Sequence, residues 1–486
     1  MSISVVWFKR DLRLRDHAPL TNAIAAGRPV FLMYCFEPEL VNDPRYSSRH
    51  WRFVGESLRD INASLRCFGA RVHVFSANPL SVFRLLHEQF GVAAVYSHEE
   101  TGLEITFQRD KAVATYLKAV GATWQETATN GIQRGRRDRR GWNRRWRELM
   151  NSPQIQPNLE HLQPQPWRRD GPLVALLLRS PPASWVTEDA EFQPGGPDAA
   201  DACMQSFFSD RGRDYEGNVS SPTASREHCS RLSPYLAWGN LSIRQVYQSL
   251  EANRQRYGWD RSMAAFESRL HWHCHFIQKF EMECRMEYED VNRGYRDMLR
   301  PPDAELQAAW REGRTGFPIV DANMRCLQAT GHTNFRMRAM LVSFFCHHLW
   351  QPWQDAAAHL ASLFLDFEPG IHYAQLQMQA GVTGTNTIRI YNPVKQSQEH
   401  DPNGRFIRRW LPELRDVPLH LLHDPSEATP MERMLELAEY PEPVVDHRLT
   451  YRQARDRLWA MRDNPHVSSE AARILDRHVE RRPLTG

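Results

Sequence analysis

The seven residues VFLMYCF, at positions 30–36, form a short run of β-branched and aromatic side chains that predicts a strand. Similar runs occur on either side of it: VVWF at 5–8, RVHVF at 71–75 and AAVYSH at 93–98. Amphipathic stretches at 49–69 and 79–91 lie between the runs, and such alternation is typical of parallel strands joined by crossover helices. The sequence therefore predicts a Rossmann-like α/β domain at residues 1–130.

Length and composition indicate a folded protein with more than one domain. The 486 residues exceed the usual length of a single domain. A content of 41% hydrophobic and 24% charged residues is ordinary for globular proteins and argues against a disordered or fibrous chain. The net charge of +3 permits contact with polyanions without requiring it. The eight cysteines have no C-x-x-C pair and no regular spacing, which favours a reducing compartment.

Residues 131–200 join this domain to a second one. They begin with an Arg- and Trp-rich segment and continue, from residue 151, with a Pro-, Gln- and Gly-rich stretch that is typical of a long connector. Past residue 201 the strand signals fade and helical periodicity dominates. We expect residues 201–486 to form a nearly all-helical domain.

Three histidines and a cysteine crowd into RLHWHCHFIQK, at residues 269–279. His271 and His275 are four residues apart and would share one face of a helix, which is the spacing that zinc proteases use. The glutamate base that belongs between them is missing, and a third ligand is not apparent. The alternative is that these polar residues face a cofactor or a cleft, and we favour it over a metal site.

The run RGRRDRRGWNRRWRE, at residues 134–148, holds eight arginines and places Trp142 and Trp146 one helical turn apart. Arginine beside aromatic residues can bind phosphates and stack on bases, so the segment 134–147 is a candidate nucleic-acid contact. The alternative is a solvated helix whose tryptophans pack on the neighbouring domain. The sequence contains no phosphate-binding loop and no serine-nucleophile motif, so phosphoryl and acyl transfer have no support.

Four stretches give the chain a specific resemblance to the DNA photolyase and cryptochrome family. They are VVWFKRDLRLRDHAPL at 5–20, SRLSPYLAWGNLS at 230–242, REGRTGFPIVDANMRCLQATG at 311–331 and RIYNPVKQSQEHDPNGRFIRRWLPEL at 389–414. The resemblance covers nearly the whole chain. It implies an antenna-type α/β domain joined by a long connector to an all-α FAD-binding domain. A second antenna chromophore stays open, because EETGLEITFQRD at 99–110 lacks the acidic contact that folate-type antennae use.

The resemblance also implies a set of FAD-binding positions, which are Tyr215, Ser230, Arg231, Leu232, Ser233, Arg338, Asp366, Glu368 and His372. Residues 230–233 would cradle the pyrophosphate, with Tyr215 on the same edge. Arg338 would pair with Asp366 beside the flavin, and such a pair suits the control of charge in a low-dielectric pocket. Glu368 takes the place of an aspartate near the isoalloxazine.

The substrate side departs from the repair photolyases. Arg269 replaces a glutamate that hydrogen-bonds a pyrimidine dimer, and Met378 replaces a tryptophan that packs on it. Trp272 keeps the other stacking position, so an aromatic ligand is still accommodated. The exchange of an acceptor for a donor argues against standard dimer repair.

The flavin side departs as well. His372 aligns with the asparagine or aspartate beside flavin N5. Leu376 replaces the flavin-proximal tryptophan of the photoreduction chain, while Trp353 keeps the middle position. The usual route for electrons is therefore interrupted at its first step.

Three hypotheses follow from the resemblance and its departures. In the first, FAD absorbs blue light and passes an electron to a nucleic-acid or other substrate, or the protein acts as a cryptochrome-type photoreceptor. In the second, a light-independent flavoenzyme uses His372 at N5 and Arg269 as an anchor for an anionic substrate. In the third, FAD is structural and the basic surface recruits a partner. Since no signal-peptide pattern or bilayer-spanning run occurs, we expect a cytoplasmic protein without membrane contact, whose oligomeric state stays open.

Overall fold

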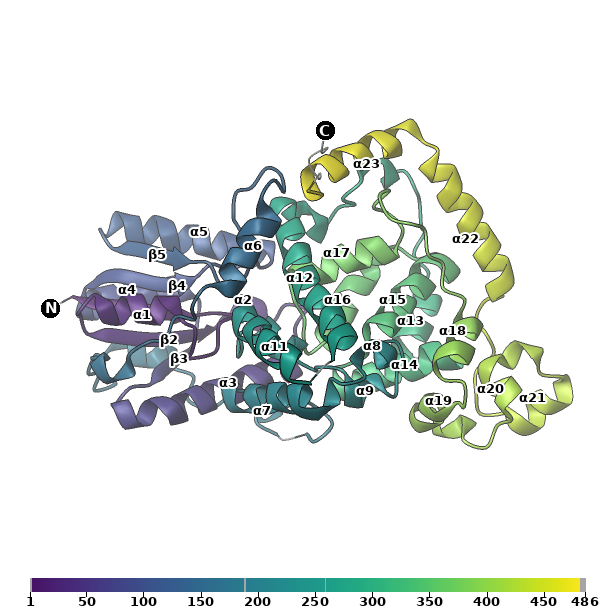
Figure 1. Ribbon diagram of the computed structural model, residues 1–486, viewed down its shortest axis with the longest axis horizontal. Coiled ribbons are helices and arrows are strands. Elements are labelled where there is room, and N and C mark those ends of the chain that lie inside the picture. The colour runs from purple at the N-terminus through teal and green to yellow at the C-terminus, as the bar shows by residue number, and fades with distance from the viewer. Residues whose placement is uncertain (1, 188, 258, 481–486) are drawn as a thin grey trace.

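A computed structural model describes residues 2–187, 189–257 and 259–480. It consists of an N-terminal sheet domain and a larger helical domain that lie side by side (Figure 1). The last two helices, α22 (His447–Arg462) and α23 (Pro465–His478), run back along the outside of the helical domain.

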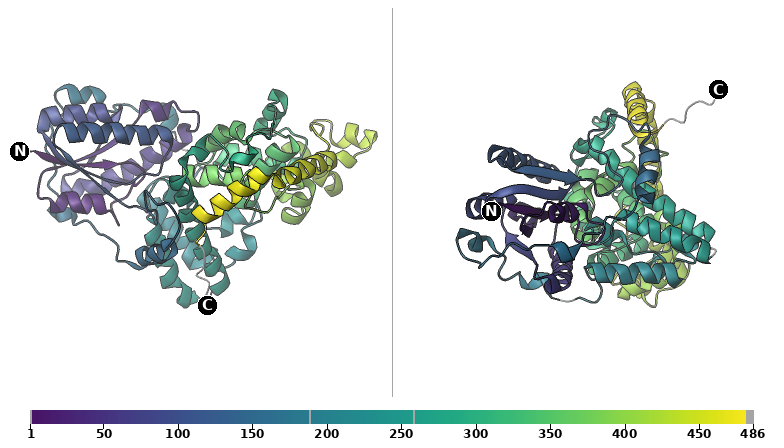
Figure 2. Two further views of the ribbon diagram at one scale, coloured as in Figure 1. Left: turned by 90° about the horizontal axis from the view of Figure 1, so that it is seen from above. Right: turned by 60° about the vertical axis from the view of Figure 1, so that its left-hand side comes forward.

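Five parallel strands form the sheet in the order β3-β2-β1-β4-β5. They are β1 (Ile3–Phe8), β2 (Val30–Phe36), β3 (Val72–Ser76), β4 (Val92–His98) and β5 (Thr123–Thr127). The helices of this domain are α1 (Ala18–Ala25), α2 (Pro38–Val41), α3 (Ser48–Leu65), α4 (Pro79–Phe90) and α5 (Glu104–Ala119), and Figure 2 shows that they cover both faces. The predicted α/β fold is confirmed.

Strand β1 is buried on both faces, as a central parallel strand should be. Its successive side chains point to opposite faces, so Val5 and Trp7 join one hydrophobic cluster while Val6 and Phe8 join the other. The cluster that contains Val6 and Phe8 continues into the helical domain. One face of the sheet and the helical domain therefore share a hydrophobic core.

The helical domain is confirmed as well. Its helices are α7 (Pro197–Ser206), α8 (Tyr215–Asn218), α9 (Ser225–His228), α10 (Ser233–Ala237), α11 (Ile243–Tyr257), α12 (Asp260–Met282), α13 (Ala304–Glu312), α14 (Pro318–Thr330), α15 (Phe335–Ser343), α16 (Trp353–Leu363), α17 (Pro369–Gln379), α18 (Pro393–His400), α19 (Arg405–Trp410), α20 (Leu419–His423) and α21 (Pro430–Glu436), followed by α22 and α23. Proline at the first turn and a capping side chain before it start several of them, as at Asn392 before α18.

Between the two domains, α6 (Trp142–Asn151) leads into the connector. The connector runs back along the sheet domain, where the amide of Leu178 donates to the Val74 carbonyl at 2.9 Å. Strand β3 is the edge of the sheet, so this contact covers hydrogen-bonding groups that would otherwise be open to other chains.

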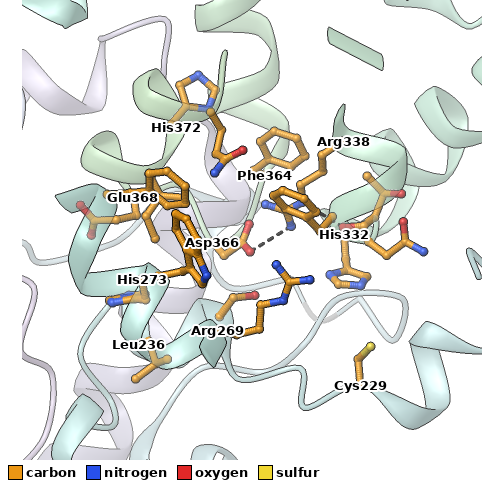
Figure 3. A pocket seen from close by; sticks show the side chains of 18 of the residues that line it. Cys229, Leu236, Arg269, His273, His332, Arg338, Phe364, Asp366, Glu368 and His372 are labelled. Atoms are coloured by element: carbon orange, nitrogen blue, oxygen red, sulfur yellow. Dashed lines mark hydrogen bonds and ion pairs between the residues drawn. The ribbon is translucent and has the colours of Figure 1, made fainter. Parts of the chain in front are cut away.

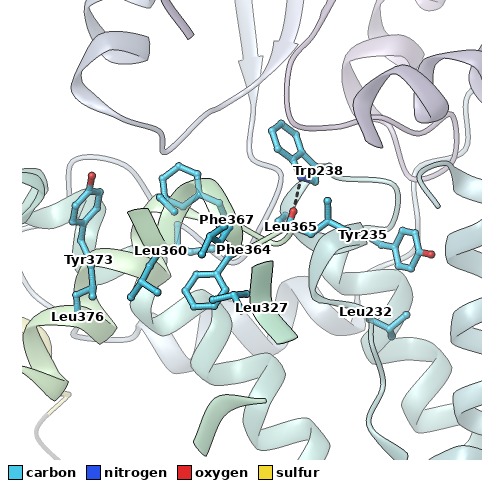
Figure 4. Close-up of a cluster of buried hydrophobic side chains, with 14 of the residues drawn as sticks. Leu232, Tyr235, Trp238, Leu327, Leu360, Phe364, Leu365, Phe367, Tyr373 and Leu376 are labelled. Carbon is cyan, nitrogen blue, oxygen red and sulfur yellow. Dashed lines mark hydrogen bonds between the residues drawn. The ribbon is translucent and has the colours of Figure 1, made fainter. Parts of the chain in front are cut away.

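Arg10, two residues past the end of β1, links the sheet domain to the helical domain. Its Nε donates to the Ala237 carbonyl at 2.9 Å, and a terminal nitrogen donates to the Phe367 carbonyl. The guanidinium also lies 3.8 Å from the Glu368 carboxylate and 4.7 Å from the centre of the Trp238 ring. Trp238 in turn donates to the Leu365 carbonyl at 3.0 Å, within the cluster drawn in Figure 4.

Gly239 allows this close approach. Its φ is +73°, and a Cβ there would lie 2.2 Å from the Arg10 carbonyl oxygen. Any other residue at this position would push the two domains apart.

The first prediction concerns Arg10. Replacement by Met keeps the apolar stem but leaves the buried Glu368 carboxylate without its partner, so we expect the free energy of unfolding to fall by about 3 kcal/mol. Chemical denaturation measures this loss. Arg15, half-exposed and paired with Asp201, supplies the control Arg15→Met, which should cost far less. Equal losses for the two variants would contradict the proposed role of Arg10.

Candidate functional site

A cavity of about 300 Å³ opens in the helical domain (Figure 3). Four segments surround it: the loop that leads into α10, one face of α12, the loop that leads into α15, and the chain from residue 364 into α17. All nine positions predicted to bind FAD line this cavity, namely Tyr215, Ser230, Arg231, Leu232, Ser233, Arg338, Asp366, Glu368 and His372.

The loop before α10 is held in an unusual shape. Arg231 has a φ of +59°, which is rare for a residue other than glycine. Gln193 of the connector fixes it from both sides, since its Oε1 accepts from Arg231 Nε at 3.1 Å and its Nε2 donates to the Arg231 carbonyl at 2.9 Å. Arg211 donates to the carbonyls of Cys229 and Ser230. These contacts fix the wall of the cavity that residues 230–233 form.

The pair of Arg338 and Asp366 lies at the centre of the cavity. The guanidinium donates to one carboxylate oxygen at 2.9 Å and lies 4.1 Å from the centre of the Phe364 ring. Burial would raise the pKa of Asp366, but Arg338 outweighs it and holds that pKa below its ordinary value. The carboxyl is therefore charged at neutral pH.

Two buried polar atoms of the cavity wall have no hydrogen-bond partner within the described residues: Asp366 Oδ1 and His332 Nε2. Buried groups of this kind normally find a partner in folded proteins. A polar ligand in the cavity would supply the missing partners, and FAD, with donors and acceptors on its ring and ribityl chain, fits this requirement.

Glu368 lies at the boundary of the two domains. It caps α17 through the amide of Gly370, and Arg10 approaches its carboxylate from the sheet domain. Burial raises the pKa of Glu368 even though Arg10 acts in the opposite direction. The carboxyl thus takes up a proton more readily than an exposed glutamate.

His372 lies at the edge of the cavity, on the opposite side from Arg269 in Figure 3. Its Nε2 is 2.9 Å from the Ala357 carbonyl oxygen, so this nitrogen carries the proton and donates it. Burial lowers the pKa of His372 to about 4. At neutral pH the imidazole is uncharged and its N–H is already engaged, which leaves Nδ1 as an acceptor. At flavin N5, His372 could therefore accept a proton through Nδ1 but not donate one.

The mouth of the cavity presents a cation beside aromatic rings. Arg269 is exposed and its guanidinium lies 5.3 Å from the centre of the Phe335 ring. Trp272 is 45% exposed and Phe335 is 41% exposed, which is high for such large apolar side chains. An aromatic ligand with a negative charge fits this combination.

Met378 is not among the residues that line the cavity. On α17, the residues that line the cavity share the inward face at helical spacing, and they are Ile371, His372, Gln375, Leu376 and Gln379. Met378 is half-buried and lies at the edge of that face, one turn from Gln375. The contact of Met378 with a substrate therefore stays a prediction. The amides of Gln375 and Gln379 lie on the wall of the cavity.

The crowded histidines of α12 divide between two surroundings. His273 lines the cavity, and burial lowers its pKa to about 4. His271 contacts Asn143 Oδ1 at 2.8 Å, and its ring lies 5.1 Å from that of Trp142. His275 also packs on Trp142. These side chains therefore contact α6 and the cavity and do not converge on one point.

In the Arg- and Trp-rich segment, the tryptophans pack on the neighbouring domain, which is the second of the two interpretations of residues 134–147. Trp142 and Trp146 are each only 2% exposed and both lie against His271. The two rings cannot stack on nucleic-acid bases, which corrects that part of the prediction for residues 134–147. Arg140 and Arg144 remain exposed and can still contact phosphates.

The crevice at the carboxyl ends of β1 and β4, where open parallel sheets commonly bind ligands, is filled by charged side chains. Arg109 pairs with Glu37 and with Glu100 at 2.6 Å, and Lys9 lies 3.3 Å from Asp110. The cavities left there are about 40 and 30 Å³. In this arrangement of the side chains, each has room for only a few water molecules.

Comparison with known proteins identifies the family. A family model described as the FAD binding domain of DNA photolyase matches residues 266–460, and another described as DNA photolyase matches residues 4–133. The chain is 30% identical over 471 residues to the deoxyribodipyrimidine photo-lyase of Vibrio cholerae, covering 91% of this chain and 96% of the relative. It is 29% identical over 471 residues to a cryptochrome DASH of Gloeobacter violaceus, covering 91% and 93%.

Solved structures agree. A cryptochrome from Synechocystis superposes with a TM-score of 0.84 at 24% identity, covering 94% of this chain and 99% of that one. A bacterial class III photolyase from Agrobacterium tumefaciens gives 0.82 at 24% identity, covering 96% and 98%. The chain belongs to the DNA photolyase and cryptochrome family, and its helical domain is an FAD-binding domain. Within the described ranges, no helix has the length and apolar character needed to cross a membrane.

Sequence reasoning missed several residues of the cavity: His332, Phe335, Gln375 and Gln379. The helical spacing of Gln375 and Gln379 from His372 could have revealed the two amides. His332 and Phe335 lie in a loop and at the start of a helix, where no periodicity marks them.

The low pKa of His372 makes a testable prediction. Between its ordinary value of 6.5 and about 4, the unfolded chain binds a proton that the native imidazole does not, so stability falls as the pH falls. From pH 7 to pH 5, this group alone should cost about 2 kcal/mol.

The variant His372→Asn should lack the part of the stability loss between pH 7 and pH 5 that comes from this imidazole. Urea denaturation of both proteins at pH 7 and pH 5 gives the difference directly, and the buried histidines common to both proteins cancel. A loss that is the same in both proteins would show that His372 is protonated in the native state at pH 5.

Proposed function

We propose that this protein uses FAD and blue light to transfer an electron to an aromatic, anionic substrate at the cavity mouth, with a nucleic-acid base as the favoured class. The supporting observation is a cavity with an Arg338–Asp366 pair at its centre and exposed Trp272, Phe335 and Arg269 at its opening. The same cavity thus offers a site for the cofactor inside and a surface for the substrate at its mouth. Trp272, Phe335 and Arg269 form this surface, which we call the substrate platform.

When bound, FAD supplies the light absorption and the transferable electron. The residues of the chain position it and control charge around it. Residues 230–233 would hold its phosphates, with Gln193 and Arg211 keeping that loop in shape. The charged Asp366 and its partner Arg338 would fix the electrostatic potential beside the ring. The neutral His372 would leave that potential unchanged across the physiological pH range.

The mouth suits a base that is already unstacked. Base stacking on an exposed indole does not depend on sequence, and a guanidinium beside it attracts the phosphate backbone. Arg269 is a donor where dimer repair needs an acceptor, and Met378 stands where a tryptophan would pack on the dimer, so standard cyclobutane-dimer repair is not the favoured reaction. Relatives named as photo-lyases and as cryptochromes are equally similar to this chain, and therefore do not decide between the two activities.

A light-independent flavoenzyme is the second candidate, and the site disfavours it. Such an enzyme needs a group that delivers or removes a proton at N5. His372 has its N–H committed to the Ala357 carbonyl and a pKa near 4, so it is a weak base and no donor at neutral pH. No feature of this cavity, within the described residues, distinguishes a signalling photoreceptor from a protein that transfers an electron to a substrate.

The substrate platform can be tested by binding. Trp272→Ala should weaken binding of a short single-stranded oligonucleotide by about 1–3 kcal/mol, because one stacked base is lost. Arg269→Ala should reduce the slope of the logarithm of the binding constant against the logarithm of salt concentration by about 1, which corresponds to one phosphate contact. Fluorescence anisotropy at several salt concentrations measures both quantities. Arg261→Ala, an exposed arginine on the same helix, is the matched control and should have the smaller effect. Equal effects for Arg261→Ala and Arg269→Ala would exclude a platform at the mouth.

The light reaction can be tested by spectroscopy. Trp353 is buried, and its N–H donates to Asp290 at 2.7 Å, but Leu376 offers no oxidisable ring toward the flavin site. We expect bleaching of the bound flavin under blue light with an external reductant to be slow, and Leu376→Trp to accelerate it.

The variant Leu376→Phe adds a ring of similar bulk that is hard to oxidise, and should stay slow. If all three proteins bleach at one rate, electrons do not pass through this position. A bound flavin that stays oxidised in all of them would contradict the light-driven proposal.

A further inference from the structure

The sign of the charge changes abruptly along residues 424–462. Residues 424–446, which include α21, contain seven acidic side chains and one arginine, a formal charge of −6. Helix α22 follows directly, and its sixteen residues contain five arginines and one aspartate, a formal charge of +4 with histidine neutral. In Figure 1, α21 lies at the right-hand end of the helical domain and α22 along its outer edge. Two segments of opposite charge therefore lie side by side in sequence on the outside of the molecule.

Three large apolar side chains of α21 face the solvent. Met431, Met434 and Leu435 are 68%, 68% and 67% exposed. Their spacing of three and four residues places them on one face of the helix. Apolar side chains that gather on one exposed face mark a surface that binds another macromolecule. Methionine suits such a surface, because its flexible side chain adapts to the shape of a partner.

The carboxylates that surround this apolar face are available to a partner. Glu436, Glu439 and Glu442 are exposed, and none of them has an ion pair within the residues that the structure describes. Helix α21 itself is well fixed, since it begins with a capping box between Thr429 and Glu432 and has proline in its first turn. We call the exposed face of α21 and these carboxylates the acidic patch, whose members are Met431, Met434, Leu435, Glu436, Glu439 and Glu442.

Helix α22 presents the opposite charge. Arg452, Arg455, Trp459 and Arg462 follow one another at spacings of three and four residues and share one face, which we call the basic patch. Trp459 is 49% exposed, and the guanidinium of Arg462 lies 5.1 Å from the centre of its ring. In the described part of the chain, Arg452 and Arg462 have no ion pair and Arg455 pairs only with its neighbour Asp456. The stems of the arginines add apolar surface beside the indole.

The two segments border one open groove of about 730 Å³. Arg433 and Glu442 line it on the side of α21, and Arg448, at the start of α22, lines it on the other. Arg448 pairs with Glu427, so the two segments already attract each other within one chain. The acidic and basic patches have no such partner, although they lie close together. Neighbouring complementary patches allow a twofold axis to bring each patch of one copy onto the opposite patch of another.

We propose that the protein forms a twofold-symmetric dimer, in which the acidic patch of each copy binds the basic patch of the other. Met431, Met434 and Leu435 would pack on Trp459 at the centre of each contact, and carboxylate–guanidinium pairs would surround them. The symmetry makes the contact twice, which doubles the buried area toward the roughly 1,000 Å² that a specific interface needs. The inference does not depend on the proposed electron transfer, because neither patch lines the FAD cavity.

Analytical ultracentrifugation of the FAD-loaded protein measures this association. We expect a dimer at low salt that dissociates as the salt rises from about 50 to about 500 mM, since exposed ion pairs are screened. Glu436→Arg with Glu439→Arg reverses the acidic patch, and Arg452→Glu with Arg455→Glu reverses the basic patch. Each double variant should raise the dissociation constant at least about tenfold, because like charges then face each other.

An equimolar mixture of the two double variants is the sharpest test. In a heterodimer both contacts again join opposite charges, so the mixture should form a dimer that neither variant forms alone. The double variant Arg140→Glu with Arg144→Glu makes the same change of charge on exposed residues of α6 and should dimerise like the parent protein. The variant Met434→Gln keeps the size of the side chain and the charge of the patch, and should weaken the dimer by making its centre polar.

Several results would overturn the inference. They are a parent protein that stays monomeric up to about 100 µM at low salt, a dimer that withstands both reversals, and a mixture of folded variants that gives no heterodimer. A ladder of larger species would show an open, head-to-tail contact and contradict the closed dimer. A monomer that binds an oligonucleotide through Arg452 and Arg455 would assign the basic patch to nucleic acid. The absorbance of bound FAD reports whether each variant is folded.

Discussion

The contact of Arg10 with the helical domain is the constraint on which the rest of the structure depends. A single guanidinium leaves the end of β1, donates to two carbonyls of the helical domain and approaches Glu368 at the start of α17. The same helix carries the inward face of the cavity. The contacts of Arg10 therefore fix the position of the cavity wall relative to the sheet. The two domains behave as one structural unit around the cofactor site.

The ionisable groups around the cavity differ in their protonation state according to their position. A carboxylate kept ionised by Arg338 lies inside the cavity, a carboxyl that protonates more readily lies behind it at Glu368, and histidines with low pKa values surround both. Burial causes the pKa shifts of Glu368 and His372, whereas for Asp366 the nearby Arg338 outweighs burial. Such a site holds its electrostatic potential steady because few of its groups titrate near neutrality.

The fold could be predicted from the sequence because its signals are local. Short apolar runs in regular alternation with amphipathic stretches define a parallel sheet, and the FAD positions lie in contiguous motifs such as residues 230–233. The wall of the cavity was harder to predict, because it depends on which face of α17 turns inward. That rotation places Gln379 on the wall and Met378 at its edge, and it is set by packing between distant elements. The tryptophans of α6 could not be assigned either, because their burial depends on packing against residues of distant elements such as His271 and Tyr247.

The connector has a consequence for how the protein assembles. In sequence it is the least regular part of the chain, yet Gln193 holds Arg231 from both sides and Phe192 lies beside Arg49 and Arg52 of α3. The strained loop beside the cofactor is thus completed by a segment that must first settle against the other domain. A tether of equal length and different sequence would join the two domains without these contacts to Arg231. The shape of the cofactor loop is therefore coupled to the seating of the connector on α3.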